Sequence, residues 1–393
     1  MKILTEFPGE IKQKLIALRR DLHQHPELSF NEEQTSLRLF NELKSFNLDS
    51  VERVAGTGVI AQIKGQNRKV PAVALRGDID ALPIQEETKL KFASTNPGVM
   101  HACGHDIHAS WIVAAAYSLI QKPAAGDVVL ILQPAEEVGK GALAMIKAGA
   151  LKGVKAIFGA HVDRRFLVGQ VVAQEGPLAA SSDEFHIELI GSGAHAARPH
   201  EALDPIVGAS ALVGALQTIV SRRKNPAFPA VVTVGTINAG TAANIIPDKA
   251  KLSGTIRAVD PATRQLLIQE VRRITESQAA SYGLTARVRI EEGAPPIVNP
   301  AMPTAWARQA AASVLGDAGL AKMETLNLAA EDFAFYMEKI PGCFLRIGAR
   351  EKGGEVIPAH SGKFYAAEES IFIGGAVLAE AARIASASLA KKG

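Results

Sequence analysis

The stretch DVVLILQPAEE (127–137) places an apolar run directly before two adjacent glutamates. The apolar part has the length and composition of a buried β-strand. VPAVAL (70–75) and VKAIFGA (154–160) have the same character, and helical stretches around 106–120 and 140–149 separate the three runs. Strands that alternate with helices indicate an α/β fold, in which a largely parallel sheet is covered on both faces.

The middle of the chain has a different order of elements. The expected strands and helices of this region are FHIELIG (185–191), a helix at 204–220, AVVTVGTINAG (230–240), AKLSGTIRAV (250–259), a helix at 261–282 and TARVRIE (285–291). Their order, β-α-β-β-α-β, is typical of a ferredoxin-like domain. We therefore expect a small domain over 182–292, inserted into a larger domain that 1–181 and 293–393 form together. The larger domain ends in an Ala-rich helix from about Glu368.

Composition excludes several classes of protein. The 393 residues carry a net charge of +3 and contain no long basic run, so we expect no nucleic-acid partner. The first residues lack the apolar core of a signal peptide, and the most apolar helical stretch, WIVAAAYSLI (111–120), is too short to span a bilayer. The only cysteines, Cys103 and Cys343, cannot form a disulfide framework. We expect a cytoplasmic protein with no membrane partner.

Several side chains that bind metals stand where the predicted strands end. Two glutamates follow one strand, and His161 follows VKAIFGA directly. The stretch MHACGHDIHAS (100–110) places Cys103 and His105 just before a helix, and His360 lies in the loop before the last helix. Ligands of open α/β sheets bind at the carboxyl ends of the strands, so these groups are expected at one edge.

The donor types suggest the metal. Thiolate, imidazole and carboxylate suit zinc, with manganese, cobalt or nickel as alternatives. A cysteine, three histidines and one glutamate exceed what one tetrahedral zinc needs, so a bridging ligand could hold two ions about 3.5–4 Å apart. The other glutamate is then free to act as a general base. Alternatively, a lone Cys-x-His is often structural, and adjacent glutamates are usually solvated.

A dinucleotide-binding motif is present only in outline. Gly191-Ser-Gly193-Ala-His-Ala196 follows a strand and fits the glycine pattern. However, Pro199 intervenes and the helical period begins only near Asp204, and the acidic residue expected about 20 positions on is missing. The sequence therefore argues against a nicotinamide-dependent oxidoreductase.

The sequence resembles one group of metal-dependent amidohydrolases over nearly its whole length. The group includes hippurate hydrolase, N-acyl-amino-acid amidohydrolases and indoleacetyl-amino-acid hydrolases. The motifs that carry the resemblance occur in order, as RRDLHQHPELSFNE, RGDIDALPI, MHACGHDIHA, QPAEE, HAARPHEALDPI, NIIPDKAKLSGTIR and AEDFAFYMEKIPGCF. The resemblance implies a two-metal, aminopeptidase-like catalytic domain with a ferredoxin-like lid.

The resemblance also assigns residues. It implies that Glu136 is the general base. It also implies that Cys103, as the bridging ligand, binds the metals together with His105, Glu137, His161 and His360. In the lid, it implies that His195 stabilises the oxyanion, from its own subunit or a partner's, and that Asn244 and Arg257 bind the substrate's carboxylate. The types fit, because a guanidinium suits a carboxylate and an imidazolium suits developing negative charge.

The chain departs from the family pattern at three places. Gly362 stands where the last ligand motif usually has a proline, and Tyr365 stands where it usually has an acidic residue. These changes put the rigidity of the His360 loop in question. Arg198 occupies a lid position that is often uncharged, where it could favour an acidic substrate group or simply face solvent.

The function expected from this reading is hydrolysis of the amide bond of N-acyl amino acids or similar conjugates by two divalent ions. The alternatives are a metallo-dipeptidase or carboxypeptidase of the same fold and a non-catalytic metal-dependent binding protein. We also expect a homodimer through the lid, because an outer strand edge of the lid would otherwise be exposed.

Overall fold

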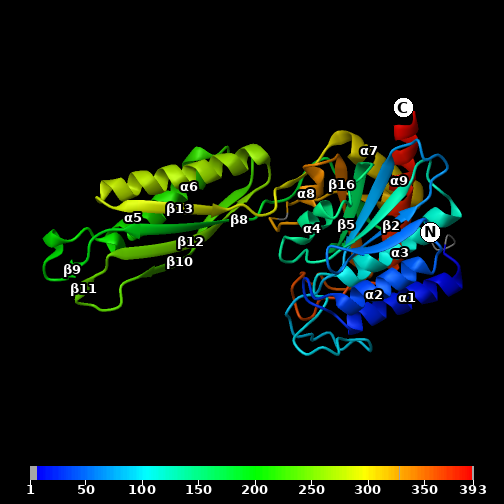
Figure 1. Ribbon diagram of the computed structural model, residues 1–393, viewed down its shortest axis with the longest axis horizontal. Helices are drawn as coiled ribbons and strands as arrows, with labels where there is room; N and C mark the ends of the chain where they lie inside the picture. The colour runs from blue at the N-terminus through cyan, green and yellow to red at the C-terminus, as the bar shows by residue number, and fades with distance from the viewer. Residues whose placement is uncertain (1–6, 327, 392–393) are drawn as a thin grey trace. The chain divides into compact units, whose positions relative to one another are not determined.

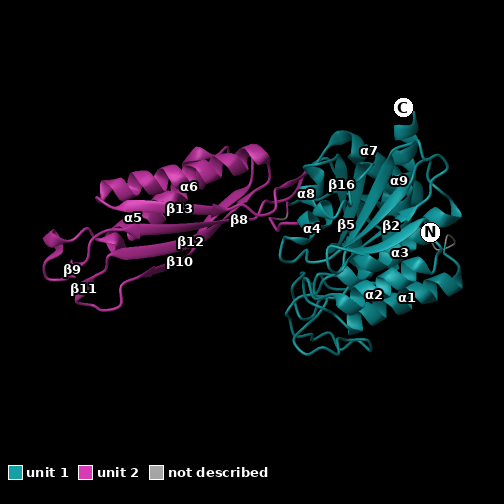
Figure 2. Ribbon diagram, viewed as in Figure 1, with its two compact units in different colours: residues 1–176, 299–325, 332–393 teal, residues 177–298, 326–331 magenta. Residues whose placement is uncertain are grey.

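The structure is a computed structural model that describes residues 7–326 and 328–391. The chain forms two compact units, shown in different colours in Figure 2. The first contains residues 1–176, 299–325 and 332–393, and the second contains residues 177–298 and 326–331. Each unit is described by itself.

An eight-stranded sheet is the centre of the first unit (Figure 1). Its strands, in spatial order, are β1 (Ser50–Val54), β2 (Gly58–Ile63), β4 (Val128–Gln133), β3 (Ala72–Asp78), β5 (Val154–Leu167), β16 (Gly342–Arg350), β6 (Val171–Val172) and β15 (Leu320–Ala321). The four strands β4, β3, β5 and β16 run parallel to one another. The strands β1, β2 and β6 join this parallel centre through antiparallel pairs, and the edge strand β15 pairs parallel with β6.

Two apolar helices cover strands of this sheet. In α3 (His105–Gln121) and α9 (Glu369–Ala390) most residues are buried, because both helices pack into the core. They approach closely at Gly374 and Gly375, where an added Cβ would lie 2.4 Å from the Trp111 ring and 2.5 Å from Ala114 Cβ. Side chains at these two positions would push the helices apart, at a cost typical of an overpacked core.

The remaining helices of the first unit are α1 (Gly9–Gln24), α2 (Glu33–Lys44), α4 (Gly141–Lys147), α7 (Ala301–Leu315) and α8 (Ala334–Met337). The sequence patterns did not identify α2, α7 or the β1–β2 hairpin. The strand predicted from VKAIFGA (154–160) is too short, because β5 continues through His161 to Leu167.

The second unit is the expected ferredoxin-like domain. Its elements are β8 (Asp183–Ile190), α5 (Pro205–Thr218), β10 (Ala230–Ala239), β12 (Lys249–Ala258), α6 (Pro261–Ser281) and β13 (Thr285–Glu291). The antiparallel sheet has the order β10-β12-β8-β13, and α5 and α6 pack against it to form a separate core. Both helices begin with an aspartate and a proline, and Asp204 and Asp260 accept N-cap hydrogen bonds from Ile206 and Thr263.

Candidate metal centre

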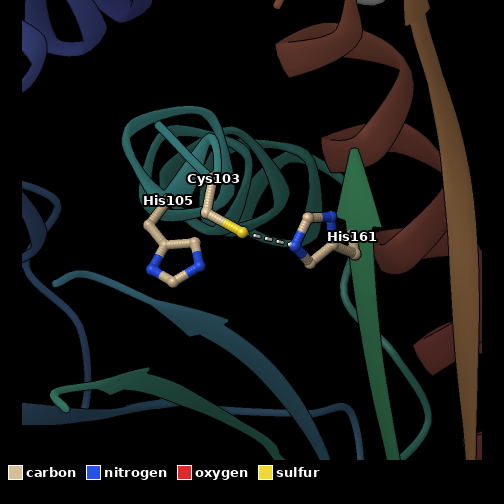
Figure 3. A group of neighbouring side chains, drawn as sticks. All are labelled: Cys103, His105 and His161. Atoms are coloured by element: carbon tan, nitrogen blue, oxygen red, sulfur yellow. Dashed lines mark hydrogen bonds between the residues drawn. The ribbon is translucent and has the colours of Figure 1, made fainter. Parts of the chain in front are cut away.

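Three of the expected ligands meet where α3 begins beside β5 (Figure 3). Cys103 lies two residues before His105, the first residue of α3, and its Sγ is 3.2 Å from His161 Nε2. Gly104 makes this turn possible, because its φ is +90° and an added Cβ would lie 2.5 Å from Val162 Cγ2. The donor atoms of Cys103, His105 and His161 all lie within 4.8 Å of one another.

Glu137 and His360 extend this cluster. Glu137 follows β4, and its Oε1 is 3.8 Å from His105 Nε2. Its Oε2 is 3.4 Å from Nε2 of His360, which lies in the loop before α9. The donor atoms of Cys103, Glu137 and His360 form a second set within 4.8 Å. Cys103 belongs to both sets, as a bridging ligand between two ions would.

His105 and His161 each direct Nε2 to this centre, because Nδ1 is used in a hydrogen bond. His161 Nδ1 donates to the Val162 carbonyl at 2.7 Å, and His105 Nδ1 donates to Asp80 Oδ1 at 3.0 Å. Each Nε2 is therefore the atom that can ligate a metal. His105 Nε2 and Glu137 Oε1 are buried and make no hydrogen bond. Buried polar atoms normally have a partner, so this pair fits a divalent cation between them.

The electrostatics favour positive charge at the centre. Burial alone would lower the pKa of His105, but the nearby carboxylates of Asp78 and Asp80 outweigh it and raise that pKa well above its usual value. Burial, with Glu137 next, raises the pKa of the Cys103 thiol. A bound divalent cation would reverse this effect and favour the thiolate. Burial lowers the pKa of His161, which keeps the imidazole neutral, as a ligand must be.

Two residues at the centre have unusual backbone conformations. Ala135, just before the two glutamates, has a φ of +52°, and His360 has a φ of +64°. Positive φ is uncommon outside glycine and costs on the order of 1 kcal/mol or more. The turn at Ala135 is held by Glu32, which accepts from the Ala135 N–H at 2.8 Å. His360 is held by its own N–H, which donates to the Ala102 carbonyl at 2.9 Å.

Glu136 lies beside this centre. One of its carboxylate oxygens, one His105 nitrogen and one Glu137 oxygen lie within 4.8 Å of one another. Glu136 Oε1 also accepts from the backbone N–H of Asp332, at 3.4 Å. The side chain is partly exposed, so it can reach a substrate as well as the ligands.

Two of the expected lid residues lie together in the second unit, and the third lies apart. The short strands β9 (Ala194–His195) and β11 (Ile245–Ile246) pair, and the Ala196 N–H donates to the Asn244 carbonyl at 3.0 Å. His195 and Asn244 are exposed and line one open hollow, which extends to Lys249 at the start of β12. Arg257 is near the other end of β12, where its Nη1 donates to the Ser181 carbonyl at 3.3 Å.

The strand β12 separates these two groups. Lys249 and Arg257 are eight positions apart along this extended strand, which corresponds to roughly 26 Å. One lid therefore cannot bring His195 and Arg257 to the same small substrate molecule.

Arg198, the charged residue at a lid position that is often uncharged in the family pattern, is exposed and lies 3.7 Å from Glu201.

Two other buried histidines, His23 and His108, have structural partners. His23 contacts Asp106 at 2.8 Å and Glu86 at 3.1 Å. His108 donates to Asp78 at 2.6 Å and accepts from the Val162 N–H at 3.0 Å. Of the buried aspartates near the centre, Asp80 contacts His105 directly, whereas Asp106 contacts His23 and Arg19.

Several known proteins are similar to this chain in sequence and structure. The pattern of peptidase family M20/M25/M40 matches residues 74–384. An N-acetyl-L-cysteine deacetylase of Bacillus subtilis is 43% identical over 344 residues, which cover 86% of this chain and 81% of that protein. Thermostable carboxypeptidase 2 of Saccharolobus solfataricus is 38% identical over 373 residues, 93% of each chain. A dinuclear metal binding peptidase of Bacillus subtilis has a TM-score of 0.85 and 37% identity, covering 96% of this chain and 99% of its own.

Proposed function

Since the chain belongs to peptidase family M20/M25/M40, whose members hydrolyse carbon–nitrogen bonds, we propose that it cleaves the amide bond of N-acyl amino acids or similar conjugates, releasing a carboxylic acid and an amino acid. The observation that carries this proposal is the pair of buried atoms without hydrogen bonds, His105 Nε2 and Glu137 Oε1, beside a thiol and two further imidazoles. Such a set fits divalent metal ions and has no comparable structural use.

We assign the five ligands as the sequence predicted, namely Cys103, His105, Glu137, His161 and His360. When bound, two divalent ions such as zinc or manganese would polarise the substrate carbonyl and activate water. Glu136 then accepts a proton from the attacking water and delivers it to the leaving nitrogen. Its partly exposed carboxylate beside Glu137 supports this role.

The lid residues support catalysis from two places. Arg257 is proposed to bind the substrate carboxylate, and His195 with Asn244 to stabilise the oxyanion and the substrate. Because roughly 26 Å of strand separates the two groups, we propose that they serve different active sites. Arg257 then acts in its own subunit, and His195 and Asn244 act in the site of a partner subunit.

A homodimer through the lid accounts for an exposed apolar surface of the second unit. Near the His195 hollow, the large apolar side chains with exposed fractions of 40% or more are Leu203, Ile206, Val207, Ile237 and Ile245. The helical segment Pro205–Arg223 is apolar, yet only 33% of the residues in its most apolar stretch are buried. Exposed apolar patches of this kind mark protein interfaces. A cytoplasmic location remains part of the proposal.

The experiment is an assay of metal-reconstituted protein against N-acetyl, N-benzoyl and indoleacetyl amino acids, with dipeptides in parallel. We expect hydrolysis of one or more N-acyl amino acids and about two ions per chain by elemental analysis. A strong preference for dipeptides would favour the carboxypeptidase alternative, which the Saccharolobus relative supports. Metal-loaded protein that cleaves neither class would overturn the proposal.

A further inference from the structure

Asp332 is a buried aspartate that no ligand or substrate role explains. It lies just before α8 and is 1% exposed. Its Oδ1 accepts from Arg76 Nη2 and from Gln133 Nε2, both at 2.8 Å. Its Oδ2 accepts from Gln133 Nε2 and from the Ala142 N–H, both at 2.9 Å.

These donors bracket the loop that carries Glu136. Gln133 is the last residue of β4, and Ala142 lies in the first turn of α4, so Asp332 ties both ends of the loop to one carboxylate. The backbone N–H of Asp332 then donates to Glu136 Oε1 at 3.4 Å. One residue thus fixes the base of the loop and contacts the side chain that the loop presents.

The charge of Arg76 does not explain why a carboxylate is present at position 332. Arg76 Nη1 already donates to Asp78 at 2.6 Å, and both residues are fully buried. A second buried carboxylate has a desolvation penalty that its hydrogen bonds must offset. An asparagine of the same shape would turn an N–H towards at least one of the three donors, because a carboxylate accepts at both oxygens and an amide does not.

We propose that Asp332 is a positioning residue that holds Glu136 in the orientation needed for proton transfer. This inference rests on the proposed role of Glu136 as the general base. Asp332 acts through the loop and through its own backbone N–H. Misplacement of a reacting group by about 1 Å can slow a reaction on the order of 100-fold.

The experiment is a double-mutant cycle between Asp332→Asn and Glu136→Gln on the metal-loaded protein. We expect D332N to lower kcat by about 10- to 100-fold, with KM and metal content close to those of the wild type. In the E136Q background, D332N should cause no further loss, because the group that it positions is already gone. A merely structural role would lower both backgrounds by the same factor.

A matched control is Asp127→Asn. Asp127 is a buried aspartate at the opposite end of β4 from Gln133, and it also accepts from a glutamine amide and a backbone N–H, those of Gln62 and Gly65. D127N should lower the melting temperature and leave kcat unchanged. If D332N does not fold, Gln133→Met removes the amide that donates to both carboxylate oxygens, and it should show the same dependence on Glu136 with a smaller loss.

The outcomes separate this inference from the proposed function. Equal losses from D332N in both backgrounds, or loss of metal in D332N, overturn the positioning role alone. An E136Q enzyme with near wild-type activity overturns the role of Glu136 and the inference with it.

Discussion

Asp80 holds His105 and Glu137 through its two oxygens. Its Oδ1 accepts from His105 Nδ1 at 3.0 Å, and its Oδ2 accepts from the Glu137 N–H at 3.0 Å and from Ser29 Oγ at 2.7 Å. A single buried carboxylate thus orients an imidazole ligand and the loop of a carboxylate ligand. Partners of this kind typically affect metal affinity 10- to 100-fold.

Asp80→Asn is therefore expected to weaken metal binding by about 10- to 100-fold, measured by competition with a chelator of known affinity. Ser29→Ala removes one hydrogen bond to the same carboxylate and leaves both ligand contacts, so it serves as the control with a smaller effect. An unchanged metal affinity in D80N would show that His105 and Glu137 are oriented without Asp80.

Glu136→Gln should keep both metal ions and lose activity by about 10²–10⁴-fold, as expected for a lost general base. Glu137→Gln should lose metal, because it removes a charged ligand from the middle of the centre. Elemental analysis and kinetics on the two variants separate these roles. If E136Q lost the metal and E137Q kept it, the two assignments would have to be exchanged.

His195→Ala should lower kcat by about 10²–10³-fold, the effect of one lost oxyanion donor. Mixed dimers of H195A and E136Q subunits then identify the site that His195 serves. If it acts in the partner's site, one site of each mixed dimer has both residues and activity returns on mixing. If it acts in its own subunit, mixing restores nothing.

Arg257→Ala should mainly raise KM and should reduce the preference for a substrate with a free carboxylate over the corresponding amide. The matched substrate pair is its own control, since the two molecules differ only in the group that Arg257 would bind. A variant that still strongly prefers the free acid would rule out the carboxylate role.

The loop that carries His360 is fastened by Tyr365, one of the residues that depart from the family pattern. The Arg164 guanidinium lies 4.1 Å from the Tyr365 ring centroid, and the Tyr365 hydroxyl donates to Glu351. Arg164 also donates to Glu351 at 3.0 Å and to the Glu355 carbonyl at 2.7 Å. Gly362 is needed for a close approach, because an added Cβ would lie 2.6 Å from the Gln85 carbonyl.

Tyr365→Ala is expected to weaken binding of the metal ion that His360 would hold, because the loop loses both the ring and the hydroxyl of Tyr365. Tyr365→Phe keeps the ring over Arg164 and should weaken binding less. Metal titrations of the two variants compare these contributions directly. If the wild type and Y365A bound metal equally well, the loop would not depend on Tyr365.

His23 predicts a dependence of stability on pH. Burial alone would lower its pKa, but the carboxylates of Asp106 and Glu86 outweigh burial and raise it above 6.5. The stabilisation by protonated His23 is therefore fully present below the unfolded pKa of about 6.5 and is lost as the pH rises through the folded pKa. The melting temperature of the wild type should exceed that of His23→Gln by more at pH 6 than at pH 9. An equal difference at both pH values would contradict the prediction.

The parts of the fold that sequence could predict are those with a local physical signature. Apolar runs that end in Glu136 or His161 identified central strands, and the rule that ligands bind at carboxyl ends placed those residues together. The antiparallel pairing of β2 with β4 and of β6 with β16 escaped prediction, because these partners are distant in the sequence. The role of Asp332 also escaped it, since its partner Gln133 is 199 residues away. The φ of His360 had no signal at all, because the residue type gave no reason to expect it.

The order of the ligands along the chain has a consequence for synthesis. His360, and the strand β16 that lies beside β5, are encoded after the whole of the inserted unit. While the ribosome is still translating the insert, four of the five ligands exist but the sheet lacks an inner strand. Under the proposed ligand assignment, a nascent or prematurely terminated polypeptide would hold an incomplete centre, and hydrolytic activity is expected only once translation has passed His360.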